Sequence, residues 1–523
     1  MSYEPEGRHR SPIVGDLNLP PDGETPGSGE QVPMLVELNV NYPGGLAAVR
    51  REFYALWREF ADVAGGWWPE DEDPANLVEP RVPSGLALIA PKLYQCVLTR
   101  ADLRRMVQRD HERAEGRPPT IFRVWPDYPL HPQIDRSAPT VKANAAWQSY
   151  GARGRGIVWA VIDSGIDAGH PHFGGLELAH DDAASLRGQT SRLHRDFSYY
   201  VDPGGNGPVS GAGDDPKRAL VDEAGHGTHV AGIIAGCTPE GAHPYVAESD
   251  DPGNAGYVQR AHVGTLSGMA PECELLSIKV MRRKPTGVWV TSSSAVIRAL
   301  TYLRTEVNID PGVPRVHGVN LSLGVEWKPD QYAAGQSPLC QAVNQLVAAG
   351  VVVVVSAGNY GARTAAGETS NTSAVLGSIT EPAHAEDCIA VGSTHRDAPH
   401  AFGVTWTSGK GPTLDGRRKP DVVAPGEWIS SAATGEVRDR AGLTPPPGAP
   451  PEEFLTYAEQ SGTSMAAPHV SGVVAAFLSA RPEFIGRPRQ VKALLTDSAI
   501  DLGRERYAQG AGLVDLMRML ANV

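Results

Sequence analysis

The sequence has few cysteines and fewer positive than negative charges. Its five cysteines are Cys96, Cys237, Cys273, Cys340 and Cys388; they are scattered and form no C-x-x-C pair, so buried free thiols are favoured over disulfides. The 47 Lys and Arg against 60 Asp and Glu give a formal net charge of -13. This balance argues against nucleic acid or an anionic membrane surface as a partner, since both require clustered positive charge.

Targeting and membrane segments are not apparent either. The N-terminus carries Arg and Glu but no apolar stretch of the kind that a secretory signal needs. The longest apolar stretch, around 348–355, is far shorter than the about 18 residues that span a bilayer. We therefore expect a cytoplasmic protein with no membrane partner.

The composition is that of a globular, loop-rich chain, with 41% hydrophobic residues, 58 Gly and 44 Pro. Because 523 residues exceed one average domain, several segments are expected. Residues 1–30 are rich in Pro, Gly and charge, which is typical of a disordered leader. Residues 31–136 form the next segment and residues 137–523 the last.

The segment 31–136 predicts a small α+β domain. Strands are indicated at 34–40, 86–99 and 120–125. Apolar residues at helical spacing predict helices at about 46–60 and 101–111.

The segment 137–523 predicts an α/β domain with a mainly parallel sheet sandwiched by helices. Its strands are continuous apolar runs, which indicates that both faces are covered. They lie at 157–162, 275–280, 318–323 and 351–357. Helices are expected at 291–306 and 339–349, the second ended by Gly350.

Two candidate site residues lie between these elements. Asp163 directly follows a buried strand, at the end where open α/β sheets place their sites, although a turn or cap aspartate is an equal alternative. His226 stands between two glycines before an apolar helix. His226 and His229 could share a metal, but the Glu of H-E-x-x-H is missing, so His229 is expected to pack within its helix.

Two further residues, Ser464 and Asn359, are candidates for the same site. Ser464 lies where a small-residue loop opens into a long apolar helix, and Pro468 is expected to be tolerated in its first turn. Asn359 ends another buried strand, where its amide could hold an oxyanion. A serine needs a base, and the resulting imidazolium needs a carboxylate. Each role has one candidate, although each residue alone would be interpreted as a cap or packing residue.

The segments VIDSGID, GHGTHVAG, SAGN and GTSMAAPH occur in this order and resemble the signature segments of the subtilase family of serine proteases. The resemblance extends from about Val141 to the end of the chain. It implies a subtilisin-like fold, in which Asp163, His226 and Ser464 form the catalytic triad and Asn359 is an oxyanion donor. It also implies a groove wall and a primary specificity pocket, made by Ser322, Leu323 and Gly324 and by Ser356, Ala357 and Gly358 respectively.

The resemblance further implies a zymogen, because residues 31–136 look like an inhibitory subtilase prodomain. Such a segment would act as an intramolecular inhibitor and folding aid until it is cut somewhere in 125–137. A stably retained domain is the alternative. Two insertions, at about 171–222 and 237–262, depart from small family members, and no calcium ligands can be matched there.

Structural calcium is therefore left open, and the loop carboxylates are expected to be solvated: Asp214, Asp215, Asp250 and Asp251. Glu381 could favour a basic substrate residue, but a surface salt bridge or solvation is the favoured interpretation.

The predicted function is serine endopeptidase activity on protein or peptide substrates, with no cofactor in the chemistry and with specific partner proteins as candidate substrates. An inactive binding scaffold and a hydrolase of non-peptide esters are the alternatives.

Overall fold

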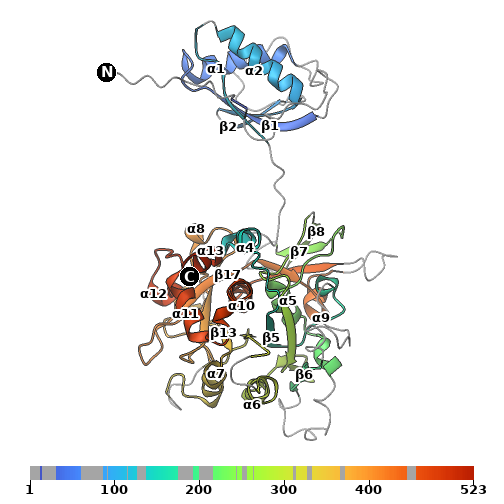
Figure 1. Cartoon of the computed structure of the whole chain (residues 1–523), viewed down its shortest axis with the longest axis vertical. Helices are drawn as coiled ribbons and strands as arrows, with labels where there is room; N and C mark the ends of the chain where they lie inside the picture. The colour runs from blue at the N-terminus through green and yellow to red at the C-terminus, as the bar shows by residue number, and fades with distance from the viewer. Residues whose placement is uncertain are drawn as a thin grey trace. The chain divides into compact units, whose positions relative to one another are not determined.

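The structure is a computed structural model in which the backbone is described in fifteen stretches. These are residues 12–13, 31–60, 86–90, 92–114, 116–126, 137–174, 192–198, 216–242, 244–249, 256–262, 264–309, 314–326, 333–364, 372–443 and 455–523. The chain divides into two compact units, Met1–Leu130 and His131–Val523 (Figure 1). Apart from residues 12–13, the predicted leader lies outside the described residues, as do the four loop aspartates named above and most of the proposed cut region.

The first unit has the element order β-α-β-β-α-β. Its strands are β1 (Gln31–Leu38), β2 (Leu86–Ala90), β3 (Leu93–Thr99) and β4 (Ile121–Pro126), and its helices are α1 (Gly45–Arg58) and α2 (Arg100–Ala114). The strands pair antiparallel in the order β2-β3-β1-β4. Alternate β1 residues, from Met34 to Leu38, pack with Phe53 and Trp57 of α1, so this unit has a core of its own.

The second unit is built on a seven-stranded sheet in which every neighbouring pair is parallel. The order is β17-β16-β13-β12-β5-β9-β6. The strands are β5 (Val158–Asp163), β6 (Arg195–Asp196), β9 (Glu274–Lys279), β12 (Gly318–Leu321), β13 (Val352–Ser356), β16 (Ile389–His395) and β17 (Val422–Glu427). The predicted parallel sheet is confirmed, with strand bounds within two residues of those read from the sequence.

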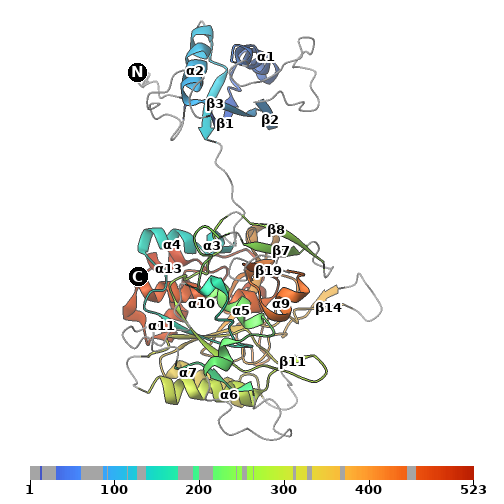
Figure 2. The ribbon, with the colours of Figure 1, turned by 90° about the vertical axis from the view of Figure 1, so that its right-hand side faces the viewer.

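Helices cover both faces of this sheet (Figures 1 and 2). Side chains that alternate along one strand enter different cores: Trp159 and Val161 pack with α5 (His226–Ile234) and α10 (Thr463–Ala480). Ala160 and Ile162 pack instead with α6 (Ser293–Tyr302) and α7 (Pro338–Ala348). This two-sided burial is why the strands read as continuous apolar runs.

The predicted helices differ from the observed ones only at their ends. The helix expected at 291–306 is α6 followed by a π-helical turn, Leu303–Val307. α7 ends next to Gly350, whose φ of 96° is the left-handed conformation expected of a helix-ending glycine. By length and composition α10 alone among the described helices could cross a membrane, but 83% of that stretch is buried inside the protein, as in a core helix.

A second sheet was not predicted. Its strands are β7 (Tyr245–Ser249), β8 (Tyr257–Ala261), β18 (Ile429–Ala432) and β19 (Thr456–Gln460), in the order β18-β19-β7-β8. The insertion at about 237–262 thus supplies a hairpin, β7–β8, that pairs in parallel with β19 just before Ser464. The insertion therefore extends the framework that leads into the Ser464 helix.

One expectation about the cysteines is wrong. All five are free thiols and four are buried, but Cys237 is exposed. It follows α5 directly, at the start of the insertion, where the chain leaves the core. Its sequence neighbours gave no sign of this exposure, because α5 ends in the buried apolar run VAGII just before it.

Candidate active site

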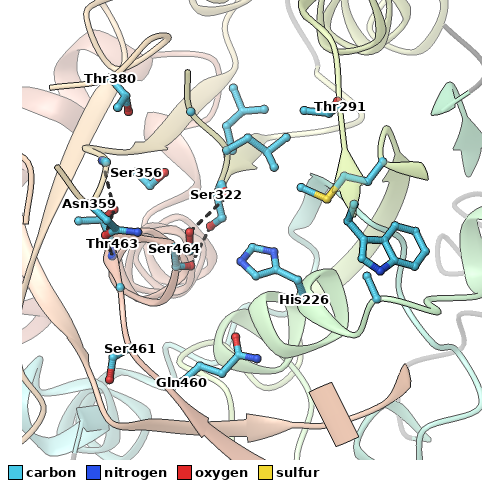
Figure 3. Close-up of a pocket in the computed structure, with 18 of the residues that line it drawn as sticks. His226, Thr291, Ser322, Ser356, Asn359, Thr380, Gln460, Ser461, Thr463 and Ser464 are labelled. Atoms are coloured by element: carbon cyan, nitrogen blue, oxygen red, sulfur yellow. Dashed lines mark hydrogen bonds between the residues drawn. The ribbon is translucent and has the colours of Figure 1, made fainter. Parts of the chain in front are cut away.

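The sequence-predicted residues meet around one large cavity of about 1340 Å³ in the second unit. His226, Asn359 and Ser464 all line it, from three different elements (Figure 3). The segments that follow β12 and β13 form part of its wall, and so does the end of β19. The cavity is therefore open along the carboxyl edge of the sheet, where parallel α/β sheets place their sites.

Asp163 is the last residue of β5 and is completely buried. Its Oδ1 atom lies 2.8 Å from His226 Nδ1 and also accepts the Ser164 backbone N–H at 2.8 Å. Burial lowers the pKa of His226, but the Asp163 carboxylate outweighs this effect, so the pKa lies above its ordinary 6.5. The pair therefore fixes the orientation of the imidazole and stabilises its protonated form.

His226 is the first residue of α5, and its position depends on a close approach of two backbones. A Cβ atom on Gly227 would lie 2.2 Å from the Gly165 carbonyl oxygen, so only glycine fits there. The α5 amides are capped by Asp222, whose carboxylate accepts the N–H groups of Gly225 (2.9 Å) and Thr228 (2.8 Å). Sequence reasoning missed Asp222, although an aspartate just ahead of a helix is a recognisable cap signal.

His229 behaves as the packing residue that we expected. It is fully buried, and its Nε2 bonds the Ala458 carbonyl at 2.9 Å. Burial lowers its pKa to about 3, so the ring is neutral. The described residues hold no group of three or more His, Cys, Asp or Glu side chains that could bind a metal ion.

Ser464 is the second residue of α10, where the backbone N–H has no acceptor within the helix. Its Oγ donates to the Ser322 carbonyl at 3.3 Å, while the His226 ring lies across the same cleft (Figure 3). The structure thus joins Asp163 to His226 and joins Ser464 to Ser322. A rotation of the Ser464 side chain is needed to bring its hydroxyl to the imidazole.

The amide of Asn359 is oriented by Thr463, which sequence reasoning did not single out. Asn359 Oδ1 accepts both the backbone N–H and the hydroxyl of Thr463, each at 3.0 Å. Because the oxygen is occupied, Nδ2 is the end left to donate into the cleft (Figure 3). Asn359 Nδ2 and the Ser464 N–H can therefore act together on an oxyanion.

Pro468 lies beyond the first turn of α10, which corrects the expectation that it belongs to that turn. It has no N–H to bond the carbonyl four residues earlier, which is that of Ser464. The Ser322 hydroxyl takes this place and donates to the Ser464 carbonyl at 2.8 Å. The proline thus frees a carbonyl next to the candidate nucleophile, and a groove residue binds it.

A buried hydrogen-bond chain continues from Ser322 into the core. Asn320 Nδ2 donates to Ser322 Oγ at 2.9 Å, and the Ser471 hydroxyl donates to Asn320 Oδ1 at 2.9 Å. Asn320 and Ser471 are completely buried, and Ser322 nearly so. This chain ties the end of β12 to α10 at Ser464 and at Ser471, and sequence reasoning missed Asn320 and Ser471 as contributors.

The predicted substrate segments reach the cavity with one exception. Its wall contains Ser322, Leu323, Gly324, Ser356 and Gly358. The side chain of Ala357 packs instead in the core between the sheet and α6 and α7.

Thr380 packs between the two predicted substrate segments. A Cβ on Gly324 or on Gly358 would lie 2.5 Å from a Thr380 side-chain atom. Thr380 therefore joins both segments below the groove.

The burial of Glu381 corrects a further prediction. A surface salt bridge or solvation was favoured, but the residue is only 2% exposed and lines the cavity. Its backbone pairs with Val325, which carries it inward. The favoured interpretation failed because the pairing partner lies 56 residues away in the sequence.

Comparisons with known proteins bear on the family of this chain. The subtilase family model (Peptidase S8) matches residues 154–513. The chain is 28% identical to the serine protease AprX of Bacillus subtilis (strain 168), over 60% of this chain and 63% of AprX. It is 28% identical to subtilisin Savinase of Lederbergia lenta, over 72% of this chain and 94% of that protein.

Subtilisin E of Bacillus subtilis (strain 168) is also 28% identical, over 76% of this chain and 75% of its own length. A solved structure of a protease from Pseudoalteromonas arctica PAMC 21717 is similar, with 21% identity and a TM-score of 0.48. That match covers 74% of this chain and 93% of the solved one.

The buried chain predicts that Asn320 positions Ser464. Replacing Asn320→Ala frees Ser322 and Ser471, and we expect labelling of Ser464 by a fluorophosphonate to slow by about tenfold, because small misplacements of a nucleophile are costly. The pH midpoint of labelling should stay unchanged, since His226 and Asp163 are untouched. A wild-type labelling rate, or a loss explained entirely by unfolding in a thermal melt, would contradict the prediction.

The raised pKa of His226 predicts the pH dependence of the same reaction. Labelling requires the neutral imidazole, so its rate should fall as pH drops through a midpoint above 6.5. In Asp163→Asn burial is opposed only by the weaker effect of the Asp222 charge, so the midpoint should move to lower pH, while the rate drops by about 10⁴-fold. Rate constants measured from pH 5 to pH 9 test this. A midpoint that does not move in the variant would show that Asp163 does not set the pKa.

Proposed function

The chain belongs to the subtilase family, and from this premise we propose that it is a serine endopeptidase that works through an acyl-enzyme on Ser464. The observation that carries the proposal is the buried Asp163–His226 pair, 2.8 Å between Oδ1 and Nδ1, at a cleft that also holds Ser464 and Asn359. A base, a nucleophile and an oxyanion donor in one cleft are what acyl transfer requires. The relatives named as subtilisins and serine proteases support the same reaction class.

In the proposed reaction, the Ser464 hydroxyl turns from Ser322 to His226, which takes its proton as the oxygen attacks the peptide carbonyl. The Ser464 N–H and Asn359 Nδ2 stabilise the oxyanion, and His226 gives its proton to the leaving amine. Water then attacks the acyl-enzyme, His226 again acting as base, and the acid product leaves. Asp163 holds the ring and balances its positive charge. These steps need no cofactor.

The proposed substrate is a protein or peptide bound in extended form along the wall formed by Ser322, Leu323 and Gly324. Extended binding to an exposed backbone edge favours peptides over simple esters, which lack a backbone to pair. An inactive scaffold is disfavoured because the triad candidates and Asn359 are all present and the cavity is open to solvent on the Asn359 side. Structural calcium stays open without assigned ligands, and the four loop aspartates expected to be solvated lie outside the described part of the chain.

We propose a cytoplasmic location and a dedicated set of protein substrates. The location is supported by the five cysteines, which are all free, as in proteins of reducing compartments. A dedicated substrate set follows from the location, because a protease among cytoplasmic proteins must avoid general damage.

We also propose that residues 31–136 inhibit the second unit until they are cut. The first unit has its own sheet and core, so it can fold as a separate body. A foldable unit ahead of a parallel sheet with many long-range contacts can assist a slow folding reaction. The alternative is that this unit is retained after folding as a structural domain.

The endopeptidase proposal predicts that the wild-type chain cleaves a peptide library and that Ser464→Ala does not. Asn359→Ala should lower kcat by about 10²–10³-fold with little change in KM, a loss measured for such a donor in a subtilisin and adopted here. The matched control is Tyr360→Ala, an exposed cavity residue next to Asn359 that should keep most of the activity. Equal cleavage by Ser464→Ala and wild type would refute the proposal.

The inhibitor proposal predicts self-processing. Intact mass measurement of the purified wild-type protein should reveal a cut within residues 125–137, and activity should rise as the cut product accumulates. Ser464→Ala should stay intact, because it lacks the nucleophile. A fully active wild-type chain that remains in one piece would instead support the retained domain.

A further inference from the structure

The cavity continues past Ser464, on the side away from the predicted substrate segments. Figure 3 shows Gln460 and Ser461 on the opposite side of Ser464 from Ser356 and Thr380. In the proposed reaction the acyl part of the substrate lies along the segments after β12 and β13. The part that leaves with the amine therefore extends toward Gln460 and Ser461.

This end of the cavity is bounded by Glu427 and Trp428, where β17 ends. Two hydrogen bonds tie the end of β17 and Trp428 to the loop before Ser464. The Trp428 N–H donates to Ser461 Oγ at 2.9 Å, and the Gly462 N–H donates to the Gly426 carbonyl at 2.7 Å. The end of β17 is thus held against the segment that leads to the candidate nucleophile.

Glu427 differs from the neighbouring cleft carboxylates because it has no partner among the described residues. Glu459 is bound by Arg396, and Glu436 by Arg283 (3.1 Å) and Arg440 (2.8 Å). The partly buried Glu427 carboxylate makes no hydrogen bond or ion pair with any described residue. Burial raises the pKa of Glu427, and the nearby His395 and Arg396 oppose this only in part. Its charge is therefore incompletely compensated.

Aromatic residues lie next to Glu427 in the sequence, in the sheet register and in the wall of the same cavity. Trp428 adopts φ 53°, a left-handed conformation that is unusual for a bulky residue, and Arg396 holds its carbonyl at 2.8 Å. The ring of His395, the register partner of Glu427, lies 5.3 Å from the Trp428 ring. Trp406 lines the same cavity and is 59% exposed.

We propose that Glu427, Trp428 and Trp406 form a subsite for a lysine or arginine side chain in the leaving part of the substrate. A partly buried carboxylate without a partner among the described residues gains from a cation, and the exposed Trp406 indole attracts cations as well. Arg440 is the only Lys or Arg among the described residues that line the cavity, and Glu436 binds it. The cavity thus favours basic over acidic substrates. This inference rests on the proposed peptidase reaction.

The test uses internally quenched peptides that share one acyl-side sequence. They carry Lys, Gln or Glu at the first or second residue after the bond that is cut. For the wild-type protein we expect kcat/KM to be about tenfold higher with Lys than with Glu, with Gln between them. Glu427→Gln should bring the ratio close to one, and Glu427→Lys should invert it.

The matched control is Glu436→Gln, which removes an equal charge from the same cavity but from a carboxylate that already has two arginine partners. The Lys preference should persist, reduced only by repulsion from the freed Arg440, because Glu427 stays in place. Equal rates for the three peptides with the wild-type protein, or a Lys preference that survives in Glu427→Gln, would overturn the subsite.

A binding measurement separates this inference from the peptidase proposal. Peptides that correspond to the leaving part alone, with Lys or Glu in the same position, are titrated into Ser464→Ala by calorimetry. The Lys peptide should bind about tenfold more tightly, and the additional substitution Glu427→Gln should abolish the difference. If no peptide is cut but this difference is found, the peptidase proposal fails and the subsite stands. Equal binding of the two peptides would refute the subsite.

Discussion

The parallel pairing of β13, β12 and β5 is the constraint on which the site depends. Because neighbouring parallel strands run in one direction, their carboxyl ends meet at one edge of the sheet. Gly318 is in register with Val352 on one side and with Trp159 on the other. Asp163, the groove wall after β12 and the segment that ends at Asn359 are therefore brought together by backbone pairing, before any of their side chains interact.

The helix α10 supplies two groups that the sheet edge does not provide. It provides the nucleophile and, at its first residues, backbone N–H groups that have no partner in the helix. Pro468 leaves the Ser464 carbonyl without a helical donor, and Ser322 binds it. A buried acceptor without a partner would cost about 1–3 kcal/mol, so this bond both stabilises the helix and holds Ser464 against β12. Stability and positioning are thus supplied by the same contact.

The sequence predicted the elements whose signals are local. Buried runs marked the strands, and glycine-flanked motifs placed Asp163, His226 and Ser464 at element ends, which the structure bears out. The remaining features depend on distant partners. The β7–β8 hairpin becomes recognisable only through its pairing with β19, and Glu381 is buried because it pairs with Val325. Local periodicity carries no information on such contacts, so the buried strand that contains Asn320 gave no sign of its hydrogen bonds to Ser322 and Ser471.

The two sides of the cleft differ in how they are built, and this has a consequence for specificity. On the acyl side, the Thr380 side chain fills the space between Gly324 and Gly358. The wall there consists of two backbone segments packed closely against this side chain. A close-packed wall discriminates by shape. On the leaving side, Glu427 and the tryptophans stand at strand and loop ends, where side chains meet solvent. Recognition there depends on charge, and it can therefore change by substitution at this rim without disturbing the frame that holds Ser464.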